Sequence, residues 1–139
     1  MRFNSSRFGE LEVEEDKVIN FPRGLAGFEE LKRYCLLFTD KPVKWLQSVD
    51  NPEIAFTLVD PFVIHKDYTF TAVDEVEEFL QCSKIEHLLV LVAATIGEKD
   101  MLVNFSSPIV INTSNMRAAQ LMIIDDRVPS KLVVPIVTE

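Results

Sequence analysis

Histidine is the side chain that most often acts as a general base, and this sequence contains two, His65 and His87. His65 lies near the carboxylates Asp60 and Asp67, and such a pairing could activate a nucleophile for hydrolysis. Ser48 is the nearest candidate, but it lacks the G-x-S-x-G turn that exposes a catalytic serine. We favour a loop histidine bonded to a neighbouring carboxylate. A small β-barrel hydrolase or ligand-binding protein using His65 with Asp60 or Asp67 is the alternative hypothesis.

The cysteines and histidines do not have the spacing of a metal centre. Zinc sites need clustered Cys and His ligands at close intervals, whereas this chain has two of each, Cys35, Cys82, His65 and His87, spread along the sequence. Both cysteines lie among apolar or helix-forming residues. We therefore interpret them as buried, reduced thiols, and we expect no metal and no cofactor.

A row of carboxylates near the N-terminus is the strongest candidate for a binding role. Glu10, Glu12 and Glu14 alternate with Leu11 and Val13, as expected for a strand with one charged and one apolar face. The row continues into Glu15 and Asp16. It would present a line of negative charge to a basic partner. The alternative is an ordinary solvated face that discourages edge-to-edge aggregation.

The segment WLQSVDNPEIAF, residues 45–56, places Gln47 and Ser48 inside an apolar run. Residues 43–49 and 54–59 predict a hairpin, because the Asp, Asn and Pro of the intervening turn favour chain reversal. Neighbouring strand residues point to opposite faces, so one of the pair would face inward and the other outward. We favour a seam that fixes the hairpin register, with partner binding by the outward residue as the alternative.

The overall charge argues against nucleic acid as a direct ligand. The chain has 14 Lys and Arg against 22 Asp and Glu, a net charge of −8, with no dense basic cluster. No apolar signal segment opens the sequence, and the longest clean apolar run, residues 88–94, is too short to cross a membrane. We expect a cytoplasmic protein with protein partners.

Most apolar runs are short and end at turn residues, which is typical of an all-β protein. The sequence predicts a short helix over 74–81 capped by Asp74, a turn of helix over 28–34, and an irregular tail around Pro129 and Pro135. It predicts strands over 10–14, 18–21, 35–38, 43–49, 54–59, 88–96, 101–105, 109–111 and 120–124. Residues 1–139 should form a single, mainly antiparallel, small β-barrel-like domain with one short helix.

Several segments, taken in order, resemble a known family. FGELEV, INFPRGLAGFEELKRY, WLQSVDNPEIAF, VDPF and MLVNFSSPIVIN are similar to segments of the FliW flagellar assembly factors, over about residues 1–112. The resemblance implies a β-barrel-like fold without catalysis. It also implies a regulator that binds cytoplasmic flagellin or, alternatively, the translational repressor CsrA, and so couples flagellin synthesis to secretion. The free protein is expected to be a monomer.

The resemblance does not assign the partner surfaces residue by residue. From charge alone, the carboxylates from Glu10 to Asp16 are our hypothesis for the CsrA surface. Exposed residues around Gln47, Ser48 and Asn104 are our hypothesis for flagellin.

Overall fold

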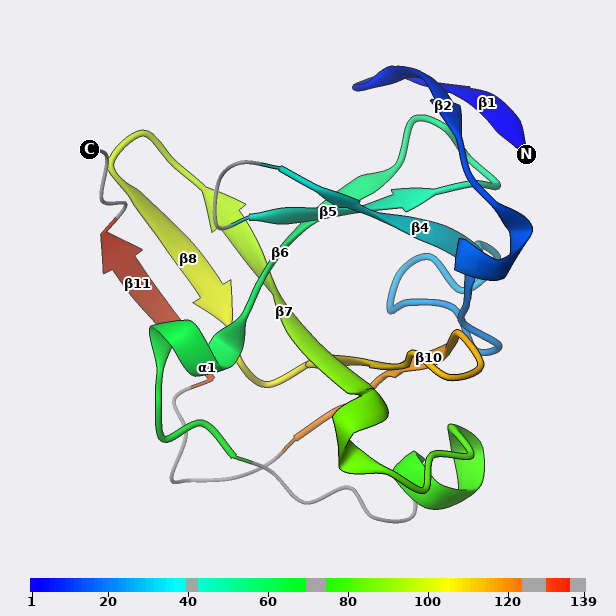
Figure 1. Ribbon diagram of the computed structural model, residues 1–139. Helices are drawn as coiled ribbons and strands as arrows, with labels where there is room; N and C mark the ends of the chain where they lie inside the picture. The colour runs from blue at the N-terminus through cyan, green and yellow to red at the C-terminus, as the bar shows by residue number, and fades with distance from the viewer. Residues whose placement is uncertain (40–42, 70–74, 124–129, 136–139) are drawn as a thin grey trace.

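Figure 1 shows a computed structural model, which describes residues 1–39, 43–69, 75–123 and 130–135. Short antiparallel strands dominate it, and the helical segments are brief. The strands are β1 (Arg2–Ser5), β2 (Gly9–Glu12), β3 (Ile19–Asn20), β4 (Arg33–Phe38), β5 (Lys44–Ser48), β6 (Ala55–Val59), β7 (Leu88–Ile96), β8 (Asp100–Asn104), β9 (Ile109–Asn112), β10 (Arg117–Gln120) and β11 (Lys131–Pro135). The helical segments are η1 (Glu15–Lys17), α1 (Pro61–Ile64), η2 (Glu75–Phe79) and η3 (Ile85–His87).

The strands form a two-stranded sheet, β1–β2, and a nine-stranded sheet in the order β11-β8-β7-β6-β5-β4-β3-β10-β9. The larger sheet curls strongly, because β7 pairs with β6 and also with β9 at the far end of the order. The curl does not make a strictly closed barrel. β3 and β10 are linked by one parallel residue pair, Asn20 with Arg117, while the other pairings are antiparallel. The predicted antiparallel, barrel-like fold is thus confirmed.

The main core fills the inside of this curl. Phe21 and Tyr34 meet there edge to face, with ring centroids 5.2 Å apart, and Leu46, Leu58 and Leu91 surround them. The Tyr34 hydroxyl is buried and has no hydrogen-bond partner among the described residues. Burial, with a smaller contribution from the Asp50 carboxylate, raises the pKa of Tyr34 to about 12. A second cluster packs Tyr68 and Phe105 between α1 and β7.

Both cysteines are buried free thiols, as expected, and burial raises the pKa of Cys35 to about 11. Cys82 lies just after η2 and contacts Leu80. No described group of histidine, cysteine, aspartate or glutamate side chains is suited to holding a metal ion. In the same part of the chain, no helix has the length and apolar character needed to span a bilayer.

Several predicted elements differ from the structure. The helix over 74–81 is a five-residue π-helical turn, Glu75–Phe79, and its expected cap Asp74 lies outside the described residues. Residues 28–32 form turns rather than helix, because β4 begins at Arg33 and draws the chain into the sheet. The last predicted strand, 120–124, is instead β10, which ends at Gln120.

The sequence did not predict the strands β1 and β11 or the helix α1, and β11 stands where an irregular tail was expected around Pro135. β1 pairs with β2, and within the described residues β11 pairs with β8 at the edge of the large sheet. Pro135 fits there because an edge strand has one row of amides that need no partner. α1 begins with Pro61 at its first position, and the Asp60 carboxylate accepts the Phe62 N–H at 2.8 Å as its cap.

Candidate protein-binding surface

The five carboxylates predicted as a binding surface, which we call the acidic strip, lie along one continuous segment. They are Glu10, Glu12, Glu14, Glu15 and Asp16, and all five are exposed. In contrast, Leu11 is half-buried and Val13 is buried. The predicted alternation of charged and apolar faces is confirmed, so the strip faces solvent.

The strip carries little compensating positive charge. Arg2 pairs with Glu12 across the hairpin at 3.6 Å, but both side chains are 68% exposed, so water screens the pair. Lys17 ends the helical turn η1 that carries Glu15 and Asp16. Among the described residues, Arg2 is the one cation within ion-pair distance of the strip. The surface is therefore strongly negative.

An apolar underside holds this segment against the large sheet. Val13 and Val18 pack on Cys35 of β4, with Phe3 and Leu37 beside them. Two backbone hydrogen bonds between Met1 and Val13, of 2.8 and 2.9 Å, close the open end of the hairpin. These apolar contacts and hydrogen bonds consequently fix the position of the strip on the large sheet.

Gln47 is part of that support and is not exposed. Its side chain is fully buried, with 0% exposure. Gln47 Oε1 accepts the Ser5 Oγ–H at 2.8 Å, which joins β1 to β5. Its Nε2 donates to the carbonyls of Ser48, Pro52 and Ile54 at 2.9, 3.3 and 3.2 Å. The expectation of an exposed Gln47 is wrong, because the β1–β2 hairpin covers that part of β5.

Ser48 is also fully buried, so the expectation that it is exposed is wrong as well. Its Oγ accepts the Asn51 N–H at 2.9 Å inside the turn between β5 and β6. The same turn places Asp50 against β4, where its carboxylate accepts the Arg33 Nε–H at 2.8 Å and the Arg33 backbone N–H at 3.1 Å. This geometry agrees with the favoured interpretation, a seam that fixes the hairpin register.

The Asp50 carboxylate accepts hydrogen bonds from both Lys32 and Arg33 in this seam. Partial burial by itself would raise its pKa. The hydrogen bonds from the Arg33 side chain and from the backbone N–H groups of Arg33 and Lys32, together with the Arg33 charge, outweigh burial and hold the pKa of Asp50 below its ordinary value. The carboxylate therefore locks the turn to the start of β4.

The third residue predicted for flagellin, Asn104, lies elsewhere. It ends β8, which is separated from β5 by β7 and β6. Its Oδ1 accepts the Ser106 N–H at 3.1 Å and the Ser106 hydroxyl at 2.8 Å. The structure thus does not bring Asn104 together with Gln47 and Ser48.

The alternative catalytic residues do not assemble either. Asp60 is occupied as the cap of α1, and Asp67 is exposed. The His65 ring packs edge to face on Phe105, with centroids 6.0 Å apart. No contact within the described residues joins His65 to Ser48, so the alternative is not favoured.

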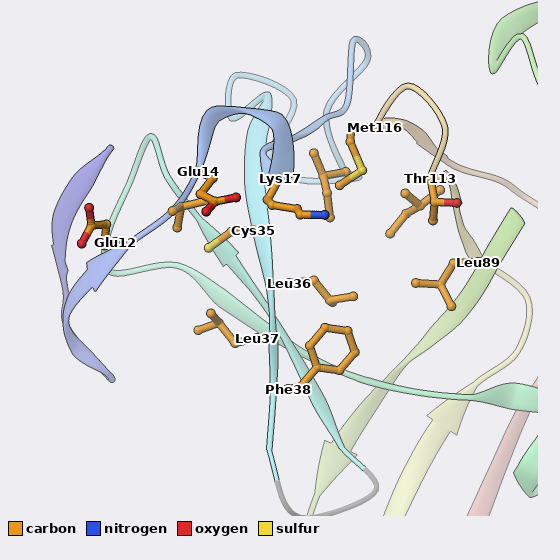
Figure 2. Close-up of a pocket in the computed structure, with 13 residues that line it drawn as sticks. Glu12, Glu14, Lys17, Cys35, Leu36, Leu37, Phe38, Leu89, Thr113 and Met116 are labelled. Atoms are coloured by element: carbon orange, nitrogen blue, oxygen red, sulfur yellow. The ribbon is translucent and has the colours of Figure 1, made fainter. Parts of the chain in front are cut away.

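Sequence reasoning missed a groove of about 550 Å³ beside the acidic strip, which we call the β4 groove. Figure 2 shows Leu36 and Phe38 pointing from β4 toward Leu89 of β7, with Lys17 and Met116 toward one end. The only sequence signal was the apolar run over 35–38. That run predicts a strand but does not show that one of its faces stays open.

Comparison with known proteins gives a consistent result. The family model described as "FliW protein" matches residues 2–134. The "Flagellar assembly factor FliW" of Caldanaerobacter subterraneus subsp. tengcongensis is 41% identical over 132 residues, covering 91% of this chain and 88% of that protein. The protein of the same name from Thermoanaerobacter pseudethanolicus is 37% identical, covering 91% and 87%. A crystal structure of the flagellar assembly factor FliW superimposes with a TM-score of 0.88 at 28% identity, covering 95% of both chains.

Proposed function

The chain belongs to the FliW family of flagellar assembly factors, and from this premise we propose that it binds two alternative protein partners in the cytoplasm, flagellin and the translational repressor CsrA. Family membership makes it an assembly factor and not an enzyme. Binding to CsrA relieves repression of flagellin mRNA. Newly made flagellin then captures this protein and frees CsrA, which couples flagellin synthesis to secretion.

The acidic strip is the observation that carries the CsrA part of the proposal. A repressor that binds RNA neutralises phosphates with Lys and Arg, so it offers a basic surface. Five exposed carboxylates on a supported hairpin complement such a surface. Complementary charge speeds association and selects the partner more than it adds raw affinity. The strip is therefore suited to fast, reversible capture of CsrA.

For flagellin we propose a surface other than the acidic strip. Burial removes Gln47 and Ser48 as contact residues and leaves Asn104. Beside it, Leu102 of β8 and Val133 of β11 pair directly and are 41% and 61% exposed. We place flagellin on this less charged face of β8 and β11.

The test compares purified flagellin and purified CsrA as ligands in calorimetry or interferometry. The first variant changes Glu10, Glu12 and Glu14 to Lys. The matched control changes Glu77, Glu78 and Glu98, which are also exposed, to Lys. Both variants alter net charge equally. We expect the first to weaken CsrA binding by about 100-fold, as for lost close charge pairs, and to leave flagellin binding unchanged. Asn104→Ala should weaken flagellin binding alone.

The outcomes separate the parts of the proposal. If both triple variants lost CsrA affinity equally, the net charge of the protein would explain the loss, and the strip would not be a specific binding site. Binding of neither partner by the unmodified protein would reject the proposed function. His65→Ala should leave the affinities for both partners unchanged. A loss of either affinity in this variant would support a binding role for the residues around His65.

A further inference from the structure

Strand β4 extends well beyond the strand that flanks it. β3 pairs with β4 only through Ile19 with Tyr34 and Asn20 with Arg33. On its other side, β4 pairs with β5 all the way to Phe38. Among the described residues, no strand pairs with residues 35–38 of β4 on the β3 side. The last part of β4 is thus an open edge inside a curled sheet.

The direction of the open main-chain groups follows from two hydrogen bonds. The Lys32 carbonyl accepts the Phe21 N–H at 2.8 Å on the β3 side, and the Arg33 carbonyl accepts the Val49 N–H at 3.0 Å on the β5 side. Successive residues of an antiparallel strand direct their main-chain groups to alternate sides. The N–H and C=O groups of Leu36 and Phe38 therefore point away from β5, toward the side where β3 no longer pairs with β4.

The turn formed by η1 explains why β3 does not extend to residues before Ile19. Continuing the register of β3 would place Lys17 opposite Leu36 and Glu15 opposite Phe38. Instead, Glu15–Lys17 coil into a 3-10 turn, which the Lys17 N–H closes on the Glu14 carbonyl at 2.9 Å. The position that the strand would have taken adjoins the β4 groove. Lys17 lines that groove while Leu36 and Phe38 face it.

The groove supplies an apolar floor next to the open edge. Leu36 and Leu89 are half-buried against the main core, and Phe38 is 70% exposed at the end of β4. An exposed edge with apolar side chains is a template for pairing with another chain, and proteins normally protect such edges. Here the edge lies recessed beside a groove of about 550 Å³, which suits it to a specific occupant.

We propose that the β4 groove accepts an extended segment of a partner protein, which adds a strand to β4 opposite Leu36 and Phe38. Apolar side chains at alternate positions of the segment fill the groove, since alternate residues of a strand face one side. The segment carries Lys or Arg at one end, because Glu12 and Glu14 line the groove and Glu15 and Asp16 adjoin it. This inference goes beyond the proposed function and holds whichever protein supplies the segment.

The first experiment measures amide hydrogen exchange by NMR on the full chain. In the free protein, the N–H groups of Leu36 and Phe38 should exchange much faster than those of Cys35 and Leu37, which face β5. Equal protection of all four would show that the edge is already covered and would overturn the proposal. Protection that rises with protein concentration would identify a second copy as the occupant, which also overturns it.

The second experiment selects ligands from a phage library of random dodecapeptides panned on the unmodified protein. Enriched peptides should alternate apolar residues and carry Lys or Arg at one end. A synthetic copy should slow exchange at Leu36 and Phe38. N-methylation of the peptide amides that face β4 should weaken binding by about tenfold or more, because a lost main-chain hydrogen bond costs roughly that ratio.

Phe38→Glu is the groove variant, chosen because the Phe38 side chain is 70% exposed and its substitution should change stability little. Val63→Glu is the matched control, since Val63 of α1 is 78% exposed and does not line the groove. The peptide should bind Phe38→Glu at least about tenfold more weakly and bind Val63→Glu normally. Recovery of no binding peptide, or equal binding to both variants, would overturn the proposal.

Discussion

The acidic strip and the β4 groove adjoin each other along β4, but they offer different groups to a partner. Cys35 and Leu37 of β4 pack under the hairpin that carries the strip, whereas Leu36 and Phe38 point toward Leu89 across the groove. Glu12 and Glu14 of the strip also line the groove. The strip offers exposed charge on a segment whose backbone is paired with β1 or coiled into η1. The groove offers apolar side chains beside main-chain groups of β4 that no described strand pairs. Two adjoining surfaces can thus support two modes of recognition, one through charged side chains and one through main-chain and apolar groups.

We expect the largest loss of stability from a substitution in the buried residues that support the strip. Gln47→Ala leaves the Ser5 hydroxyl without its acceptor, removes one donor from each of three carbonyls, and opens a small cavity. The Pro52 and Ile54 carbonyls each keep one backbone N–H donor. We expect a loss of about 3 kcal/mol in the free energy of unfolding, measured by urea denaturation.

Glu10→Gln is the control for that substitution. It removes one exposed charge of the strip and should change stability by less than about 0.5 kcal/mol. If Gln47→Ala were as mild as the control, the buried amide would not anchor the hairpin.

Salt should separate the two surfaces directly. Raising NaCl from about 50 mM to about 500 mM shortens the screening length severalfold, so CsrA bound at the strip should dissociate about tenfold more readily. The groove-selected peptide, held mainly by main-chain and apolar contacts, should change by less than about threefold. The same titration on both complexes checks this, and equal salt slopes would mean that one kind of contact dominates both.

The contribution to stability of the turn that connects β5 and β6, in which Asp50 binds Arg33 of β4, should depend on pH. Asp50 has a lowered pKa in the folded protein, so its contribution is present above the ordinary aspartate value and is lost as pH falls through the folded pKa. Asp50→Asn should be less stable than the unmodified protein by about 1 kcal/mol at pH 7, a modest value because Arg33 is partly exposed and water screens the pair.

Thermal unfolding of both proteins between pH 7 and pH 2 tests the pH dependence. The difference between them should shrink once the pH falls below about 4. A difference that stays constant over this range would exclude the Asp50 carboxylate as its source.

The smallest expected effect concerns the core at the start of β4. Tyr34→Phe removes a buried hydroxyl that has no partner among the described residues, so the variant should be more stable by up to about 1 kcal/mol. Calorimetric melting measures this gain. Destabilisation instead would reveal that the hydroxyl contributes a hydrogen bond in solution.

Local patterns determined much of this protein. The mainly apolar run over 88–96 predicts β7 with the same bounds that the structure has. Alternation near the N-terminus predicts which face of β2 is charged, and the short segments identified the family. These features depend on neighbours within a few residues, so periodicity and composition are sufficient to find them.

Tertiary structure decided where those elements meet. Gln47 is buried because a hairpin about 40 residues earlier in the chain covers it, and no local signal shows that contact. In place of the helix predicted over 74–81, the structure has a π-helical turn. β11 is a strand because its main chain pairs with β8. The β4 groove exists only because β3 ends after two residues. Strand pairing joins distant segments, so register and open edges depend on the whole chain.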